Sequence, residues 1–175
     1  KADIDGNFES IDSSLLLDLC RIIYNASLAL RDRSIDKYTN DVISLLKDVT
    51  RYLELPVSDL KTHVDYNRLR YSTLLLLTDS LIKQSETDFS NKNCQQYVKL
   101  LQNEYPKKAE PFRLSIDLAT KKANTTMIVE IGEILMRMIT SVDIIPNFDI
   151  LIGCLNTFSL MSTKKALNCL EYVLM

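Results

Sequence analysis

Apolar residues recur every three or four positions along almost the whole chain, and this spacing constrains the fold more than any other feature. In the first such segment they are Leu15, Leu19, Ile22, Ile23, Ala26 and Leu30, and in the second they are Ile35, Tyr38, Val42, Leu45, Leu46, Val49 and Leu53. A period near 3.6 residues places such side chains on one face of an α-helix. About eight segments of this kind follow one another. The sequence therefore predicts an all-α protein of about eight helices in antiparallel hairpins, arranged as a solenoid of stacked repeats.

The content of glycine and proline supports helix throughout. The 175 residues include only 3 Gly and 4 Pro, whereas the tight turns of sheet proteins need more of both. Apolar residues make up 46% of the chain and charged residues 25%, which is typical of a folded domain with a substantial core.

Breakers and capping residues set the expected helix limits. The first helix is expected at about Ser13–Leu30, with Asp12 or Ser13 as its N-cap, and a turn at Arg31-Asp32-Arg33 follows. Ser34 is expected to cap the second helix, which runs to about Leu53, and the third runs over about Asp65–Lys83, followed by a polar loop from Ser85 to Asn91. The fourth carries Cys94, Tyr97, Val98, Leu101 and Tyr105, and the fifth starts near Pro111. Asn124, Pro146 and Ser162 are expected to open the last three.

The hairpins would begin near residues 13, 65, 109 and 146, a spacing too unequal for a regular repeat. We therefore expect a flexible segment over 1–12 and a single divergent helical-repeat domain over 13–175. The chain begins with Lys1-Ala2-Asp3 and no Met, so we expect it to be a piece of a longer protein.

Charge and cysteine content limit the function classes. The net charge is −2, so autonomous nucleic-acid binding is not expected. The four cysteines, Cys20, Cys94, Cys154 and Cys169, form no CxxC pair and lie inside expected helices. Buried free thiols in a reducing intracellular compartment are the favoured interpretation. No apolar run reaches the ~18 residues that a membrane span needs, so no membrane association is expected.

No pattern of residues predicts catalysis, a cofactor, a metal site or a small-molecule substrate. His63 is the only histidine and has no nucleophile or acidic partner at a telling spacing. Asp3, Asp5 and Gly6 depart from a calcium loop after a few positions. Gly132 and Gly153 lie inside expected helices, where we expect them to permit close helix packing.

Two groups of residues allow a binding role besides a structural one. Basic pairs occur at Arg31/Arg33, Arg68/Arg70, Lys107/Lys108, Lys121/Lys122 and Lys164/Lys165. We interpret them as solvated side chains at helix ends. The alternative is that they form a basic strip that assists a DNA-bound complex. Met127, Met136, Met138 and Met161 fit core packing better than an adaptable binding groove.

Several stretches resemble one known family in order and spacing. Leu19-Cys-Arg-Ile-Ile-Tyr-Asn-Ala-Ser-Leu-Ala-Leu30 resembles the first helix of a tetratricopeptide (TPR) repeat, although Asp41 stands where a small Ala is expected in the second. Tyr24-Asn25-Ala26 with Lys37-Tyr38, Tyr97-Val98-Lys99-Leu100-Leu101, Met136 to Asp143 and Ser162 to Leu170 resemble successive parts of the sporulation-specific TPR domain family of Zip-four-like meiotic scaffolds. The resemblance runs from about Leu15 to Leu174.

This resemblance implies a role in meiosis, and it implies no catalysed reaction. It implies a non-enzymatic nuclear scaffold, associated with chromosomes, that promotes crossover formation and synapsis. It also implies protein partners: an inactive relative of structure-specific nucleases, a MutS-type heterodimer and central-element proteins of the synaptonemal complex. No partner-contact residue can be carried over. The alternatives are a HEAT- or TPR-type adaptor of another intracellular process, an enzyme with a dispersed site, and direct DNA binding.

Overall fold

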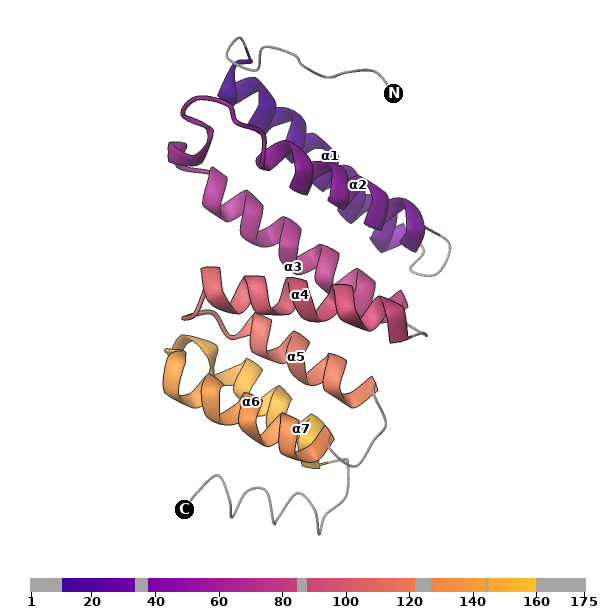
Figure 1. Cartoon of the computed structure of the whole chain (residues 1–175), viewed down its shortest axis with the longest axis vertical. Helices are drawn as coiled ribbons and strands as arrows, with labels where there is room; N and C mark the ends of the chain where they lie inside the picture. The colour runs from indigo at the N-terminus through magenta and orange to yellow at the C-terminus, as the bar shows by residue number, and fades with distance from the viewer. Residues whose placement is uncertain (1–10, 34–37, 85–87, 122–126, 144, 160–175) are drawn as a thin grey trace. The chain divides into compact units, whose positions relative to one another are not determined.

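The computed structural model describes residues 11–33, 38–84, 88–121, 127–143 and 145–159. This part of the chain contains no strand, which confirms the all-α prediction. Its α-helices are α1 (Ser13–Arg33), α2 (Thr39–Leu53), α3 (Tyr66–Gln84), α4 (Asp88–Glu104), α5 (Glu110–Lys121), α6 (Met127–Ser141) and α7 (Phe148–Ser159), with short 3₁₀ turns at η2 (Leu60–Thr62) and η3 (Ile145–Asn147) (Figure 1). The chain divides into two compact units, residues 1–84 and 85–175, and each is described by itself. The single repeat domain over 13–175 stays a prediction.

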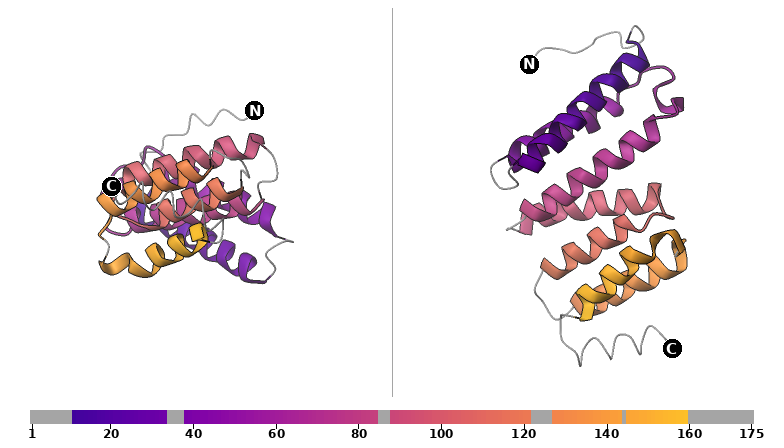
Figure 2. Two further views of the ribbon diagram at one scale, coloured as in Figure 1. Left: turned by 90° about the horizontal axis from the view of Figure 1, so that it is seen from below. Right: turned by 180° about the vertical axis from the view of Figure 1, so that it is seen from behind.

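In unit 1 (residues 1–84), α2 is the middle helix. It packs against both α1 and α3, whereas α1 and α3 contact each other only slightly. Successive helices run in opposite directions, as two opposite views show (Figures 1 and 2). Six residues of α2 are buried, and four of them are spaced by four, three and four positions: Val42, Leu46, Val49 and Leu53. This spacing is the one by which a helix fits a single row of side chains against its neighbours.

Local hydrogen bonds fix where the helices of unit 1 begin and end. The Asp12 carboxylate accepts hydrogen bonds from the backbone N–H groups of Ser14 (2.7 Å) and Leu15 (3.3 Å), so Asp12 is the N-cap of α1 as predicted. The α2 helix ends at Leu53, three residues before Pro56. The Tyr66 hydroxyl donates to the Leu53 carbonyl at 3.1 Å, which ties the first residue of α3 to the last residue of α2.

Unit 2 (residues 85–175) repeats this arrangement, with α5 as the middle helix. It packs against α4 and α6 and also contacts α7. The α5 helix contributes Phe112, Ile116 and Ala119 to the core of the unit. From α6 the core receives Ile131, Leu135 and Met138, and Val142 just after the helix continues this spacing of four, three and four. Cys94, Val98 and Leu101 of α4 are buried at the same spacing, which confirms the predicted fourth helix.

Some predicted boundaries are wrong. The α1 helix continues to Arg33, so the predicted turn at Arg31–Arg33 is its last turn, because no Gly or Pro is present to stop it. The α2 helix starts at Thr39, five residues after the predicted cap Ser34, which lies outside the described residues. The α4 helix already starts at Asp88, inside the predicted loop. The expected caps Asn124 and Ser162, and with Ser162 the eighth helix, also lie outside the described residues.

The helical glycines do not permit close packing, contrary to expectation. A Cβ atom built on Gly132 or Gly153 would meet nothing within 4 Å, so no neighbouring backbone requires the missing side chain. The run Leu74-Leu75-Leu76-Leu77 makes α3 apolar on every face. Leu74, Leu76 and Leu77 are buried and Leu75 is half-buried.

The α1 helix is apolar on two faces. Leu16, Leu17, Cys20 and Ser27 are buried in unit 1, whereas Leu15, Leu19 and Ile22 of the stripe identified in the sequence are exposed. By length and composition alone α1 could cross a membrane, which corrects the expectation that no segment reaches that limit. A helix with two apolar faces has a high mean hydropathy even in a protein that does not enter a membrane. Here one of the two faces is buried against the rest of unit 1.

Replacing Leu by Ala should affect the stability of this 175-residue chain differently on the two faces of α1. Leu17→Ala removes a side chain that is 1% exposed and should lower the free energy of unfolding by about 2–5 kcal/mol. Leu15→Ala removes one that is 68% exposed and should change it by about 0.5 kcal/mol or less. Urea unfolding followed by circular dichroism measures both variants. Equal losses of stability would contradict this assignment of the two faces.

Candidate docking surfaces

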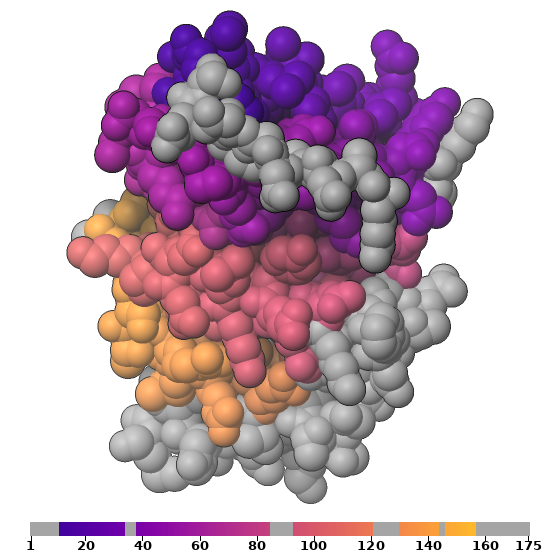
Figure 3. Space-filling view, turned by 45° about the horizontal axis from the view of Figure 1, so that its top comes forward, coloured from indigo at the N-terminus to yellow at the C-terminus, as the bar shows by residue number. Residues whose placement is uncertain are grey.

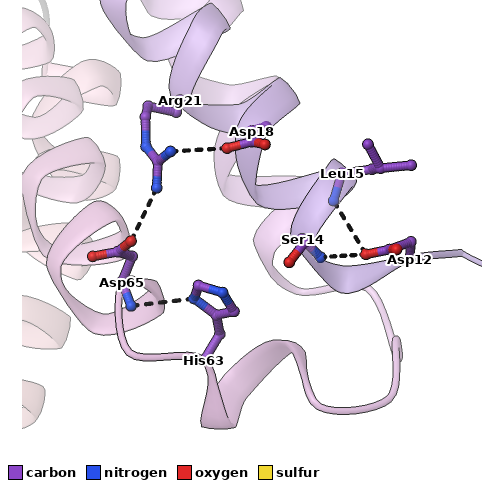
Figure 4. Close-up of polar contacts among 7 residues, drawn as sticks. All are labelled: Asp12, Ser14, Leu15, Asp18, Arg21, His63 and Asp65. Carbon is purple, nitrogen blue, oxygen red and sulfur yellow. Dashed lines mark hydrogen bonds and ion pairs between the residues drawn. The ribbon is translucent and has the colours of Figure 1, made fainter.

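His63 belongs to a polar network that joins α1 to the start of α3. The backbone N–H of Asp65 donates to His63 Nδ1 at 3.3 Å, and the Asp65 carboxylate pairs with Arg21 of α1 at 3.1 Å (Figure 4). Arg21 also contacts Asp18 of its own helix at 2.8 Å. These contacts hold the loop before α3 against α1, so the ring of His63 has a structural task.

Three of the four cysteines are buried free thiols, as predicted. Cys20 and Cys94 are 0% exposed and Cys154 is 2% exposed, and Cys169 lies outside the described residues. Burial raises the pKa of Cys20 to about 11 because the thiolate would lose its hydration. Burial also raises the pKa of Cys154 to about 11, with a further rise from the Asp117 carboxylate and an opposing effect from Arg113. Neither thiol is an activated nucleophile at neutral pH.

The raised pKa of Cys20 predicts a specific dependence of stability on pH. The folded thiol ionises at about 11 and the ordinary thiol at 9.0, so the contribution of protonated Cys20 is complete below about pH 9 and is lost as the pH rises toward 11. Other groups titrate in this range, and Cys20→Ala is therefore the reference. Denaturant unfolding at pH 8 and pH 10.5 should show a larger loss of stability for the parent chain than for Cys20→Ala. Parallel losses would contradict the pKa assignment.

The described residues do not gather the methionines or the basic pairs into one site. Met138 is buried in unit 2, Met136 is exposed on α6, and the side chains of Met127 and Met161 lie outside the described part. Arg31 pairs with Asp32 at 3.5 Å and Arg70 pairs with Glu54 at 3.4 Å. The side chains of Lys121/Lys122 and Lys164/Lys165 are not described. Among the described residues, no group of three His, Cys, Asp or Glu could hold a metal ion.

The exposed apolar face of α1 is the first candidate docking surface. We call it the outer stripe, and it consists of Leu15, Leu19, Ile22, Ala26 and Ala29. Leu15, Leu19 and Ile22 are 68%, 46% and 66% exposed. Single exposed apolar side chains are ordinary on protein surfaces, but a continuous row along one helix indicates an interaction site.

A groove on α4, α5 and α6 of unit 2 is the second candidate, with a volume of about 290 Å³. Its floor is apolar and buried, formed by Val98, Leu118 and Ile134. Lys99, Glu130 and Arg137 line it above this floor, and Gln102 donates a 2.8 Å hydrogen bond to the Ser115 hydroxyl within it. Figure 3 shows the side chains of α4 (pink) next to those of α6 (orange) on this face of unit 2.

The electrostatics of this groove are cationic. Lys99 and Arg137 are exposed and make no ion pair within the part of the chain that the structure describes, and Glu130 is the one acidic lining residue there. Sequence reasoning missed this site, because Lys99 and Arg137 lie on different helices and share no local pattern. A usable signal was present on α4, where Gln95, Lys99 and Gln102 repeat the spacing of the buried Cys94, Val98 and Leu101 one position further along.

A larger hollow of about 550 Å³ lies in unit 1, where the end of α1 meets the start of α2 and the end of α3. Arg31 and Lys83 line it, and each is paired with a carboxylate, Arg31 with Asp32 and Lys83 with Asp79 at 2.7 Å. These pairs neutralise the two cations, so this hollow is a weaker candidate for a charged ligand than the groove of unit 2.

Comparison with known proteins identifies relatives of this chain. The family model described as "Meiosis protein SPO22/ZIP4 like" matches residues 1–175. Sporulation-specific protein 22 of Saccharomyces cerevisiae is 44% identical over 178 residues, which cover 99% of this chain and 18% of the yeast protein. The chain therefore spans less than a fifth of the length of this relative. No solved structure gives a significant match.

Proposed function

Because this chain belongs to the SPO22/ZIP4-like family of meiosis proteins, we propose that it is one segment of a non-enzymatic helical-repeat scaffold. In this proposal the scaffold promotes crossover formation and chromosome synapsis by docking partner proteins, in the nucleus and on chromosomes. A segment that spans 18% of such a protein would supply one docking surface among several.

The observation that carries the docking role is the groove of unit 2. An apolar floor of Val98, Leu118 and Ile134 offers a place for one or two apolar side chains of a partner. The cations of Lys99 and Arg137 favour acidic residues beside them. Because the groove is built on three packed helices, its geometry is largely set before a partner binds, which lowers the entropic cost of docking. An acidic segment with an apolar anchor is the ligand that fits these features.

The family match favours this function over the alternative of a helical adaptor in another process, since the match covers residues 1–175. A catalytic function would need a reactive constellation. Within the described residues His63 serves a structural network, and Cys20 and Cys154 are buried thiols with raised pKa values.

Charge reversal in the groove tests the proposal in the full-length protein. The double variant Lys99→Glu/Arg137→Glu should weaken docking by about tenfold or more, because each contact in a binding hot spot is worth roughly 1–2 kcal/mol or more. Meiotic cells that carry it should form fewer crossovers and synapse incompletely, as counted by genetic mapping and by cytology.

The matched control is Lys47→Glu/Lys61→Glu, which reverses two exposed cations of unit 1 outside the groove. It makes the same change in net charge and should leave crossovers and synapsis at the parental level. Both variants should melt within a degree or two of the parent, since none of the four side chains is buried. Normal crossover number and synapsis in the groove variant would refute a docking role for this groove.

A further inference from the structure

The outer stripe of α1 follows the same spacing as the surfaces by which this chain packs its own helices. Its residues Leu15, Leu19, Ile22, Ala26 and Ala29 are separated by four, three, four and three positions. The buried residues Val42, Leu46, Val49 and Leu53 of α2 are separated by four, three and four positions, and Ile131, Leu135 and Met138 of α6 by four and three. Such a row complements the side chains of another α-helix that crosses at a shallow angle. The stripe is thus a helix-packing surface on which no helix of the described residues lies.

The side chains of the stripe decrease in size toward its C-terminal end, and this indicates which side chains a covering helix would carry. The bulky Leu15, Leu19 and Ile22 occupy the N-terminal part, and Ala26 and Ala29 occupy the C-terminal part. Backbones approach most closely over small residues, so a covering helix would carry its own large apolar side chains opposite the two alanines.

The charges beside the stripe already have partners on this chain. Asp18 pairs with Arg21, Arg21 with Asp65, and Arg31 with Asp32. A covering helix would therefore be held by apolar contact, which is typical of permanent packing and less so of transient, electrostatically steered binding.

The stripe is small for an interface between separate molecules. Its residues span 14 helical steps, which is about 21 Å at 1.5 Å per residue. At a helix width of about 10 Å it offers roughly 200 Å², against the roughly 800 Å² per partner that a stable complex buries. A helix from the same polypeptide would not need such an area, because its effective concentration is high and no freedom of a second molecule is lost.

We infer that the outer stripe of α1 is covered by an α-helix from the part of the full-length protein that lies outside these 175 residues. The yeast relative carries more than four fifths of its length outside the matched region, so the length for such a helix exists. Residues 1–10 do not fit the role, because ten helical residues would cover only about 15 Å and this segment carries Gly6 and several acids. This inference does not rest on the proposed docking groove of unit 2.

Cysteine labelling in the full-length protein tests the inference. Ile22→Cys places a thiol in the stripe, and Asn25→Cys places one on an exposed position of the same helix beside it. After brief exposure to a maleimide, peptide mass spectrometry should show at least tenfold slower labelling at position 22 than at position 25. In urea the two rates should be equal. Equal rates in the native protein would overturn the inference.

Three further labelling experiments distinguish what covers the stripe. Protection that disappears on dilution together with a dimer would assign the stripe to a second copy, and protection that needs an added protein would assign it to a partner in trans. Loss of protection after deletion of residues 1–10 would assign it to that segment. Each of these results contradicts the inference. If Ile22→Cys does not fold, Ala26→Cys is a smaller change in the same stripe and should be protected to a similar degree.

Discussion

The packing of one middle helix against both of its neighbours is the interaction on which each unit depends. In unit 1, α1 and α3 contact each other only slightly, and both are held through α2. The four residues Val42, Leu46, Val49 and Leu53 are at most 2% exposed, and burial of each is worth roughly 1.5–3 kcal/mol. In unit 2, α5 has the same position between α4 and α6. These rows of apolar side chains establish the arrangement of the helices. The Asp12 cap, the Tyr66 hydrogen bond and the Arg21–Asp65 ion pair then fix the helix ends and the loop before α3.

Much of this arrangement could be predicted, because helical period and breakers are local properties of the sequence. The all-α class, the Asp12 cap, the end of α2 before Pro56 and the burial of the cysteines follow from residues near one another in the chain. The end of α1 could not be predicted in the same way, since Arg31, Asp32 and Arg33 are compatible with both helix and turn. The two faces of α1 posed a different problem: both are apolar at helical spacing, and only tertiary packing decides that Leu16, Leu17 and Cys20 are buried.

The two candidate docking surfaces differ in chemistry and therefore in the kind of interaction that they favour. The outer stripe of α1 is apolar, lies on one helix and has its neighbouring charges paired, which suits permanent packing within one polypeptide. The groove of unit 2 has an apolar floor beneath Lys99 and Arg137, which make no ion pair with any other described residue, and this suits a separate acidic partner. The groove could not be predicted from the sequence, because its cations come from α4 and α6 and meet only in the folded unit. In the proposed function, the stripe would build the scaffold and the groove would bind its partners.

Hydrogen exchange followed by mass spectrometry tests most directly whether the middle helices hold each unit together. Amide protons exchange when a segment opens, and the segments on which all others depend open last. If the middle helices hold each unit together, the slowest exchange of unit 1 will be in α2, over residues 43–53, and that of unit 2 in α5, over residues 113–119. Faster exchange in α1 and α3 than in α2 would agree with it. Persistent protection of α1 or α3 after α2 has exchanged would contradict it.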